Sequence, residues 1–233
     1  MKRLLLTALL FLFLTPVALA ECKPETSESL MKSLLRQAPG LRSSVLKLAL
    51  DAADCAAQRG LVKRRELITV IDYSIPSSEP RLWVFDLNAK KLLFRELVAH
   101  GKNSGGNKPS FFSNASGSLA TSLGLFVTGG TYVGSNGYSL RLKGLEEGVN
   151  DMAFDRAIVM HGAPYVSKYA IKALGRLGRS WGCPAVRKEI ARKLIDTVRG
   201  GSPIFAYYPD NDWLSSSRFF SRKSSVQTAR SSR

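Results

Sequence analysis

The chain has 233 residues, of which 45% are hydrophobic and 22% are charged, a composition that excludes a disordered protein and fits a globular one. Lysine and arginine outnumber the acidic residues by 34 to 18, which gives a formal net charge of +16 at pH 7. The length allows one ordinary domain with an extension. The charge favours anionic partners, such as envelope polymers or membrane surfaces.

Residues 1–20 have the pattern of a secretory signal peptide. Lys2 and Arg3 precede an apolar run from Leu4 to about Leu14, and Ala18-Leu19-Ala20 forms a cleavage site. The run is shorter than the roughly 20 apolar residues that span a bilayer. We therefore expect a periplasmic or secreted protein with no integral membrane segment after cleavage; an uncleaved anchor is the alternative. Export argues against nucleic acid as a partner, despite the high charge.

Three cysteines remain after this cleavage: Cys22, Cys55 and Cys183. Cysteines tend to pair in an oxidising compartment, and an odd one is either intermolecular or a reactive thiol. A Cys22–Cys55 disulfide would leave Cys183 free, although the sequence alone leaves the pairing open.

The first elements along the mature chain are two helices, within residues 21–62. Helical spacing of apolar residues predicts them over 27–37 and 43–59, separated by Ala38-Pro39-Gly40. Such a hairpin would bring Cys22 and Cys55 toward the same end. We interpret it as an N-terminal appendage.

Residues 63–210 change to short β-rich segments, which predict a mainly β (α+β) domain. Strands are expected at 67–73, 82–87, 92–98, 124–128, 138–142, 157–160 and 203–208, and helices at 167–174 and 187–198. The polar loop 101–123 lacks the spacing of a phosphate-binding loop. Residues 211–233 form a basic, Ser-rich tail that we expect to be disordered.

The candidate chemistry rests on one cysteine and one of only two histidines. His161 follows the apolar segment 157–160 and precedes Gly162, whereas Cys183 stands between Gly182 and Pro184. A free thiol is only a few per cent ionised at neutral pH, so an adjacent imidazole is needed to accept its proton before attack on a carbonyl.

Backbone groups around this pair complete the expected site. The Gly162 carbonyl is a candidate to orient the imidazole, and the N–H groups of Gly182 and Cys183 are candidates for an oxyanion hole. The plain alternative is a buried, inert cysteine and a structural histidine.

These residues resemble a known family. His161-Gly162 followed by Ser180-Trp181-Gly182-Cys183 is similar to the motif of the YkuD-type L,D-transpeptidases, in the murein L,D-transpeptidase catalytic domain branch. Further matching segments between about residues 65 and 208 include 98–105, 137–140 and 178–186. The resemblance implies a YkuD-like β-sandwich or barrel-type domain with Cys183 as nucleophile, His161 as base, and Ser180 in the catalytic turn.

The resemblance also implies the substrate. Family members attack the bond between the third residue, often diaminopimelate, and the fourth, D-Ala, of a peptidoglycan stem peptide. D-Ala leaves, and an acceptor then resolves the acyl-enzyme. An amine acceptor gives a 3→3 cross-link, whereas water gives carboxypeptidase activity. No metal or organic cofactor is implied, and carbapenem acylation of the thiol is expected.

The chain departs from the family pattern near the nucleophile. Trp181 stands where many members have histidine, Ala185 stands where many have arginine or asparagine, and the His161-to-Cys183 spacing is longer than in many members. Trp181 can line a substrate pocket but cannot act as a base. These departures leave the choice of acceptor open.

Four further residues are candidates for contacting substrate, each with a structural alternative. Arg179 and Arg187 could meet substrate carboxylates or be surface charges. His100 could touch substrate or donate a structural hydrogen bond within its loop. Tyr165, four residues beyond His161, could border the site or be a packed aromatic.

Other functional classes also fit parts of the sequence. A sortase-like hydrolase shares the order histidine then cysteine but with a wider spacing, whereas an NlpC-type amidase reverses the order. A non-catalytic peptidoglycan-binding protein would fit the basic charge equally well.

Overall fold

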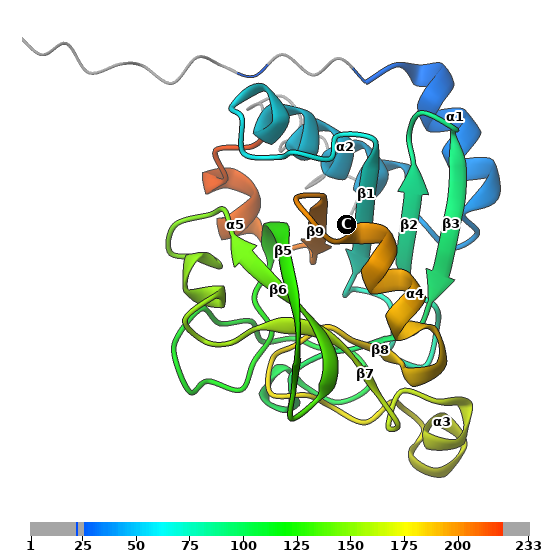
Figure 1. Cartoon of the computed structure of the whole chain (residues 1–233), viewed down its shortest axis with the longest axis vertical. Helices are drawn as coiled ribbons and strands as arrows, with labels where there is room; N and C mark the ends of the chain where they lie inside the picture. The colour runs from blue at the N-terminus through cyan, green and yellow to red at the C-terminus, as the bar shows by residue number, and fades with distance from the viewer. Residues whose placement is uncertain (1–21, 23–25, 221–233) are drawn as a thin grey trace, which may run out of the picture.

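The computed structural model describes Cys22 and residues 26–220, and Figure 1 shows their arrangement. The predicted signal peptide and most of the predicted tail lie outside these residues. Within the described part of the chain, no helix is both long and apolar enough to cross a bilayer.

One mixed sheet of nine strands forms the framework, in the order β3-β2-β1-β9-β5-β6-β7-β8-β4. The strands are β1 (Leu67–Asp72), β2 (Leu82–Asp86), β3 (Lys91–Glu96), β4 (Val98–Ala99), β5 (Gly124–Gly134), β6 (Gly137–Gly144), β7 (Val159–Ala163), β8 (Ala185–Arg187) and β9 (Pro203–Tyr207).

The sheet curls nearly into a barrel. β3 and β4 stand at opposite ends of the strand order, yet only Leu97 separates them along the chain. A flat nine-stranded sheet would place these edges some 40 Å apart, because neighbouring strands are about 4.8 Å apart. The mainly β fold expected from the sequence is confirmed.

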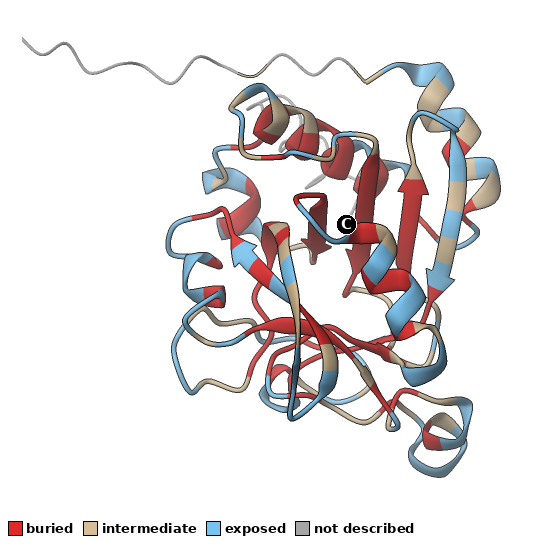
Figure 2. Ribbon diagram, in the orientation of Figure 1, coloured by how far each residue is buried: buried red, intermediate tan, exposed pale blue. Residues whose placement is uncertain are grey.

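Burial along each strand follows its place in the sheet. Every residue of β1 and β9 is buried, as expected for central strands covered on both faces. β3 lies at an edge and alternates between exposed and half-buried residues, and Figure 2 shows it as the palest of the three strands beside α1. The centre of the core therefore lies along β1 and β9.

Five α-helices and two short 3₁₀ turns surround the described sheet. They are α1 (Glu28–Gln37), α2 (Ser43–Gln58), η1 (Lys102–Ser104), η2 (Asp151–Ala153), α3 (Lys168–Leu174), α4 (Lys188–Val198) and α5 (Asn211–Ser216). The apolar face of α4 packs against β7 and β8, where Ala191 lies beside Gly162. α3 projects from the end of β7, away from the main body (Figure 1).

The helical hairpin is part of the main core, which corrects its interpretation as an appendage. Most residues of α2 are buried, and they share one apolar cluster with β1 and β9. Arg42 also forms an ion pair with Asp72 at the end of β1, at 3.0 Å. Cys22 and Cys55 form a disulfide with a Cα–Cα distance of 5.2 Å, which ties the start of the described chain to α2.

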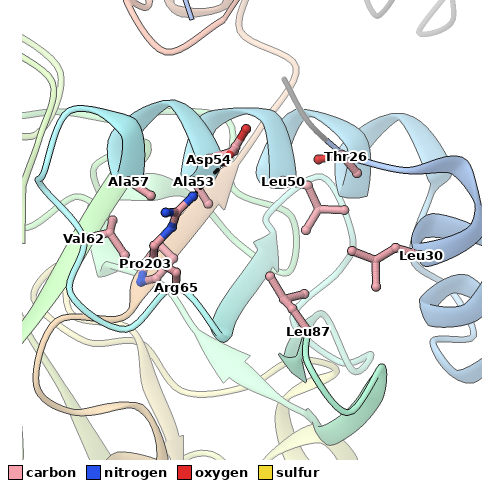
Figure 3. Close-up of a pocket in the computed structure, with 10 residues that line it drawn as sticks. All are labelled: Thr26, Leu30, Leu50, Ala53, Asp54, Ala57, Val62, Arg65, Leu87 and Pro203. Carbon is pink, nitrogen blue, oxygen red and sulfur yellow. Dashed lines mark ion pairs between the residues drawn. The ribbon is translucent and has the colours of Figure 1, made fainter. Parts of the chain in front are cut away.

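A small cavity lies between this hairpin and the sheet (Figure 3). It has a volume of about 160 Å³, is lined mainly by apolar side chains such as Leu30 and Leu50, and contains an ion pair between Asp54 and Arg65 at 3.5 Å. Neither Cys183 nor His161 lines it.

The first part of the predicted tail is ordered, which corrects the expectation for residues 211–220. Asp210 caps α5 by accepting the Trp213 N–H at 2.9 Å. Trp213 and Phe219 are buried against the core. Aromatic residues within a polar, Ser-rich stretch are therefore what folds this segment back onto the sheet.

Candidate active site

His161 lies on β7, next to the segment that leads into β8. His161 pairs with Ser139 on β6 and with Ala185 on β8. The N–H of Val159 lies 3.5 Å from the Cys183 sulfur, so the chain before β8 still runs alongside β7. Paired residues share a face of a sheet, as do residues two apart on one strand. Ala185 therefore shares a face with His161, and Cys183 lies two residues before Ala185, just outside β8.

The imidazole of His161 is oriented by the backbone. Its Nδ1 lies 3.1 Å from the Gly162 carbonyl oxygen, which is the contact expected from the sequence. A carbonyl can only accept, so Nδ1 carries the proton and Nε2 is the basic nitrogen. Burial lowers the pKa of His161, although the bond to Gly162 opposes this effect. The resting imidazole is therefore neutral at pH 7.

The Cys183 thiol is the free cysteine of the described chain and is only 8% exposed. Burial raises its pKa above the ordinary value of 9.0, whereas the Val159 N–H, the Arg156 guanidinium and the thiol's own backbone N–H oppose this effect. The sulfur is consequently a protonated thiol at neutral pH, and it needs a base at the moment of attack.

The turn that carries Cys183 is held by Ser180 and requires glycine. Ser180 Oγ accepts the Gly182 N–H at 3.1 Å and donates to the Cys183 carbonyl at 2.6 Å. Gly182 has φ of +120°, and a Cβ there would lie 2.7 Å from the Ala120 carbonyl oxygen.

This geometry corrects one expectation from the sequence. The Gly182 N–H is already donated to Ser180 and is not available to an oxyanion. The Cys183 N–H, which faces its own sulfur, stays a candidate.

Arg156 is a neighbour of the turn that sequence reasoning missed. It donates to the carbonyls of Ser113 and Ala120 at 2.7 Å and to the hydroxyls of Ser118 and Ser122 at 3.0 and 2.6 Å. A Cβ at position 182 would lie 3.4 Å from Arg156 Nη2, so the cation abuts the turn that carries Cys183. It fixes the loop that covers this turn while placing positive charge near the sulfur.

Two tyrosines are electrostatically coupled to Cys183. Burial, with a smaller contribution from Cys183, raises the pKa of the half-buried Tyr165 to about 12. Burial also raises the pKa of Tyr73, which is fully enclosed at the end of β1. Both phenols keep their protons at neutral pH and can act as hydrogen-bond donors. Tyr165 was a candidate from the sequence, whereas Tyr73 was missed because nothing in its local pattern distinguishes it from a core aromatic.

The two candidate arginines are engaged by protein groups. Arg187 forms a two-pronged ion pair with Glu96 at 2.8 and 2.7 Å. Its guanidinium joins β8 to β3, and its role in binding a substrate carboxylate stays a prediction. Arg179 donates to the carbonyls of Lys102 and Gly105 at 3.0 and 2.8 Å, which holds the loop after β4.

His100 is wrong as a substrate contact, because it is completely buried. Its Nδ1 lies 2.7 Å from Nη2 of Arg81, which is also fully buried and donates to the carbonyls of Val98 and Ile75. Burial, and the Arg81 charge, lower the pKa of His100 to about 4, so this imidazole stays neutral. Trp181, by contrast, is 72% exposed in the turn before Cys183, with Lys102 Nζ 5.9 Å from its ring centre.

No cluster of three or more His, Cys, Asp or Glu side chains within residues 22 and 26–220 could hold a metal ion. A profile of the L,D-transpeptidase catalytic domain, of the YkuD type, matches residues 37–207, which is well over half of the chain. The chain belongs to this family. The match begins inside the helical hairpin, in agreement with a core that includes α2.

Solved structures with a similar fold include other L,D-transpeptidases. An L,D-transpeptidase from Mycobacterium smegmatis is 15% identical, with 61% of this chain and 59% of that chain covered and a TM-score of 0.39. L,D-transpeptidase 1 from Mycobacterium tuberculosis is 16% identical, with 61% and 62% covered and a TM-score of 0.35. The helical cell shape determining protein Pgp2 from Campylobacter jejuni is 14% identical, with 60% and 46% covered and a TM-score of 0.40.

This chain spans less than two thirds of the length of each of these structures. The family assignment follows from the profile match over residues 37–207. No curated protein sequence matches the chain.

Ala185 stands where many L,D-transpeptidases have arginine or asparagine, and the structure places it beside His161. Ala185 is fully buried and directly opposite His161 in the strand pairing.

Proposed function

We propose that this protein is a peptidoglycan L,D-transpeptidase of the cell envelope, with Cys183 as nucleophile and His161 as general base. The proposal is supported by the position of Cys183, which lies two residues before the β8 partner of His161 and contacts the Val159 N–H of the strand that carries His161. The proton on Nδ1, held toward the Gly162 carbonyl, leaves Nε2 to accept the thiol proton.

The shifted pKa values favour proton transfer during attack over a preformed ion pair. Burial favours the neutral form of both partners. As the sulfur attacks the carbonyl between diaminopimelate and D-Ala, its proton moves to His161 Nε2 and the S–C bond forms. The imidazolium then protonates the leaving amine as the C–N bond breaks, and D-Ala departs. An amine or water attacks the thioester and regenerates the thiol.

Hydrogen-bond donors near the sulfur would stabilise the tetrahedral intermediate. The Cys183 N–H and the protonated Tyr165 phenol are the candidates. Arg156 adds positive charge behind the turn, and the exposed Trp181 ring offers an apolar surface to the substrate. The same thiol is the expected target of carbapenem acylation.

The deciding experiment incubates the mature protein with disaccharide-tetrapeptide and follows D-Ala release together with intact mass. We expect D-Ala and an acyl adduct on Cys183, and neither in the Cys183→Ala variant. Because Cys22 and Cys55 are joined in a disulfide, an adduct has no competing thiol within the described chain. Wall binding that persists without turnover or adduct would instead identify a non-catalytic binding protein.

A further inference from the structure

A second, larger cavity opens on the sheet one strand away from Cys183. It has a volume of about 480 Å³ and is formed by β5, β6 and the loops at Lys63 and Gly200-Gly201. This volume is within the range of about 300–1,000 Å³ that is typical of small-ligand sites. It lies apart from the hairpin cavity of Figure 3, with which it shares no lining residue.

Glycines keep this cavity open. The pairing of β5 with β6 shifts between Thr128 and Thr131, so Gly129 and Gly130 bulge opposite Arg141. A Cβ at Gly130 or at Gly200 would meet nothing within 4 Å, which means that side chains there would enter open space. A Cβ at Gly201 would lie 2.7 Å from Lys63 Cβ, so the missing side chain makes room for this lysine.

The charged side chains that line the cavity are all positive. Lys63, Arg141 and Lys143 line the cavity together with apolar groups, and no acidic residue does. All three cations are exposed, and none belongs to an ion pair within the described chain. Three neighbouring positive charges repel one another, so an anion bound between them would be favoured.

Arg141 is the most fixed of the three cations. Its guanidinium carbon lies 4.3 Å from the ring centre of Tyr132 and 5.8 Å from that of Phe154, whose side chain is itself 54% exposed. Aromatic faces hold a guanidinium in orientation while its N–H groups stay able to donate. A planar guanidinium held in this way matches a carboxylate, which it can bind through two parallel hydrogen bonds.

We propose that this cavity, lined by Lys63, Arg141, Lys143 and Phe154, binds the carboxylates of a peptidoglycan stem peptide. This inference rests on the proposed function for the identity of the peptide. A stem that contains diaminopimelate and a terminal D-Ala carries more than one carboxylate, which suits a site with several cations. Its aliphatic portions would contact Phe154 and the other apolar lining groups.

The position of the cavity suits a wall peptide near the nucleophile. Arg141 pairs with Val159, whose N–H lies 3.5 Å from the Cys183 sulfur. Phe154 lies two residues before Arg156, which abuts the catalytic turn. A peptide held in the cavity would therefore lie one strand from the reacting atoms.

The test titrates disaccharide-tetrapeptide into the mature Cys183→Ala protein, which binds without turnover, by calorimetry. Adding Arg141→Ala or Lys143→Ala should weaken binding about tenfold each, the size expected when one charged hydrogen bond is lost. Gly130→Leu, which fills the cavity but keeps every cation, should weaken binding similarly. Lys193→Ala removes one exposed lysine from α4 and should leave the affinity unchanged.

Unchanged affinity in the Arg141, Lys143 and Gly130 variants, with melting temperatures like the parent, would overturn the proposal. It would also be overturned if the variants lost binding to anionic lipid vesicles while tetrapeptide affinity stayed the same. Full amidation of the tetrapeptide carboxylates should abolish the dependence on Arg141.

Turnover by the protein with Cys183 intact is measured separately. If D-Ala is released but tetrapeptide affinity does not depend on the cavity residues, the proposed function holds and the proposed binding site is wrong. If affinity depends on the cavity residues but no D-Ala is released, the binding site holds and the proposed function is wrong.

Discussion

At the residue scale, Cys183 and His161 are both shifted toward their neutral forms by the same cause. Burial raises the pKa of the thiol and lowers that of the imidazole. The Cys183 sulfur therefore has little thiolate at rest, which protects it from oxidation, because the thiolate is the reactive species. Reactivity then depends on a substrate that brings an acylating carbonyl to the sulfur.

The pH dependence of alkylation tests this resting state. Because the Cys183 pKa lies above its ordinary value of 9.0, the iodoacetamide reaction should be slow at pH 7 and still rise above pH 9. Arg156→Ala removes a nearby cation that lowers this pKa, so its profile should move to higher pH, whereas Arg156→Lys should move less. Mass spectrometry of the Cys183 peptide gives the rates. A plateau already reached at neutral pH would show a preformed thiolate instead.

Sequence reasoning works well for residues whose roles are set by their chain neighbours. The Gly162 carbonyl contacts the His161 ring because the two residues are adjacent, and Gly182 is required by the turn beside it. Arg156, Tyr73 and Arg81 were missed because their roles arise only when distant strands meet. The partners of His100 and Arg187 were not predicted for the same reason, since Arg81 and Glu96 lie far from them in the sequence.

At the element scale, short segments are stabilised by single buried side chains. Glu146, after β6, is buried and accepts hydrogen bonds from the Leu125 N–H, the Trp213 indole and the Ser217 hydroxyl. It therefore joins α5 to the start of β5. Helix α5 has only six residues, too few to be stable alone, so this contact and the burial of Trp213 hold it in place.

Glu146→Gln should destabilise the protein by about 1–3 kcal/mol, because an amide nitrogen cannot accept from the donors that now face the carboxylate. Urea unfolding followed by tryptophan fluorescence measures this change, since Trp213 reports directly on the docking of α5. Glu147→Gln, at an exposed neighbouring position, is the matched control and should change the stability little. Equal stability of the two variants would mean that Glu146 does not hold α5.

The elements themselves were predicted to different degrees. The periodic helices α2 and α4 and the apolar strands β1 and β9 were found within about a residue of their observed ends. The three-residue β8 was missed because its strand character comes from pairing with β4 and β7 and not from composition. α5 was hidden within a Ser-rich stretch, since its stability comes from contacts with Glu146 and the core.

At the scale of the whole molecule, the N-terminal hairpin and the curled sheet share one hydrophobic core. α2 belongs to the same apolar cluster as β1 and β9, and Arg42 pairs with the buried Asp72. Loss of the hairpin would expose the back of the central strands. The hairpin therefore supports the framework that sets the register of β7 and β8, although it contributes no residue to the candidate active site.

The disulfide offers the sharpest test of this coupling. Cys22 and Cys55 are 33 residues apart, and closing a loop of this size stabilises a domain by about 2–4 kcal/mol, chiefly by restricting the unfolded chain. A Cys22→Ser/Cys55→Ser double variant should lose about this much unfolding free energy in urea. A single folding unit requires that its transition stay cooperative and that the sheet unfold together with the hairpin. Cys183→Ser, which removes a thiol outside the disulfide, is the control. Two separate unfolding transitions in the double variant, in which the hairpin unfolds first and the sheet stays folded, would instead show that the hairpin is an appendage.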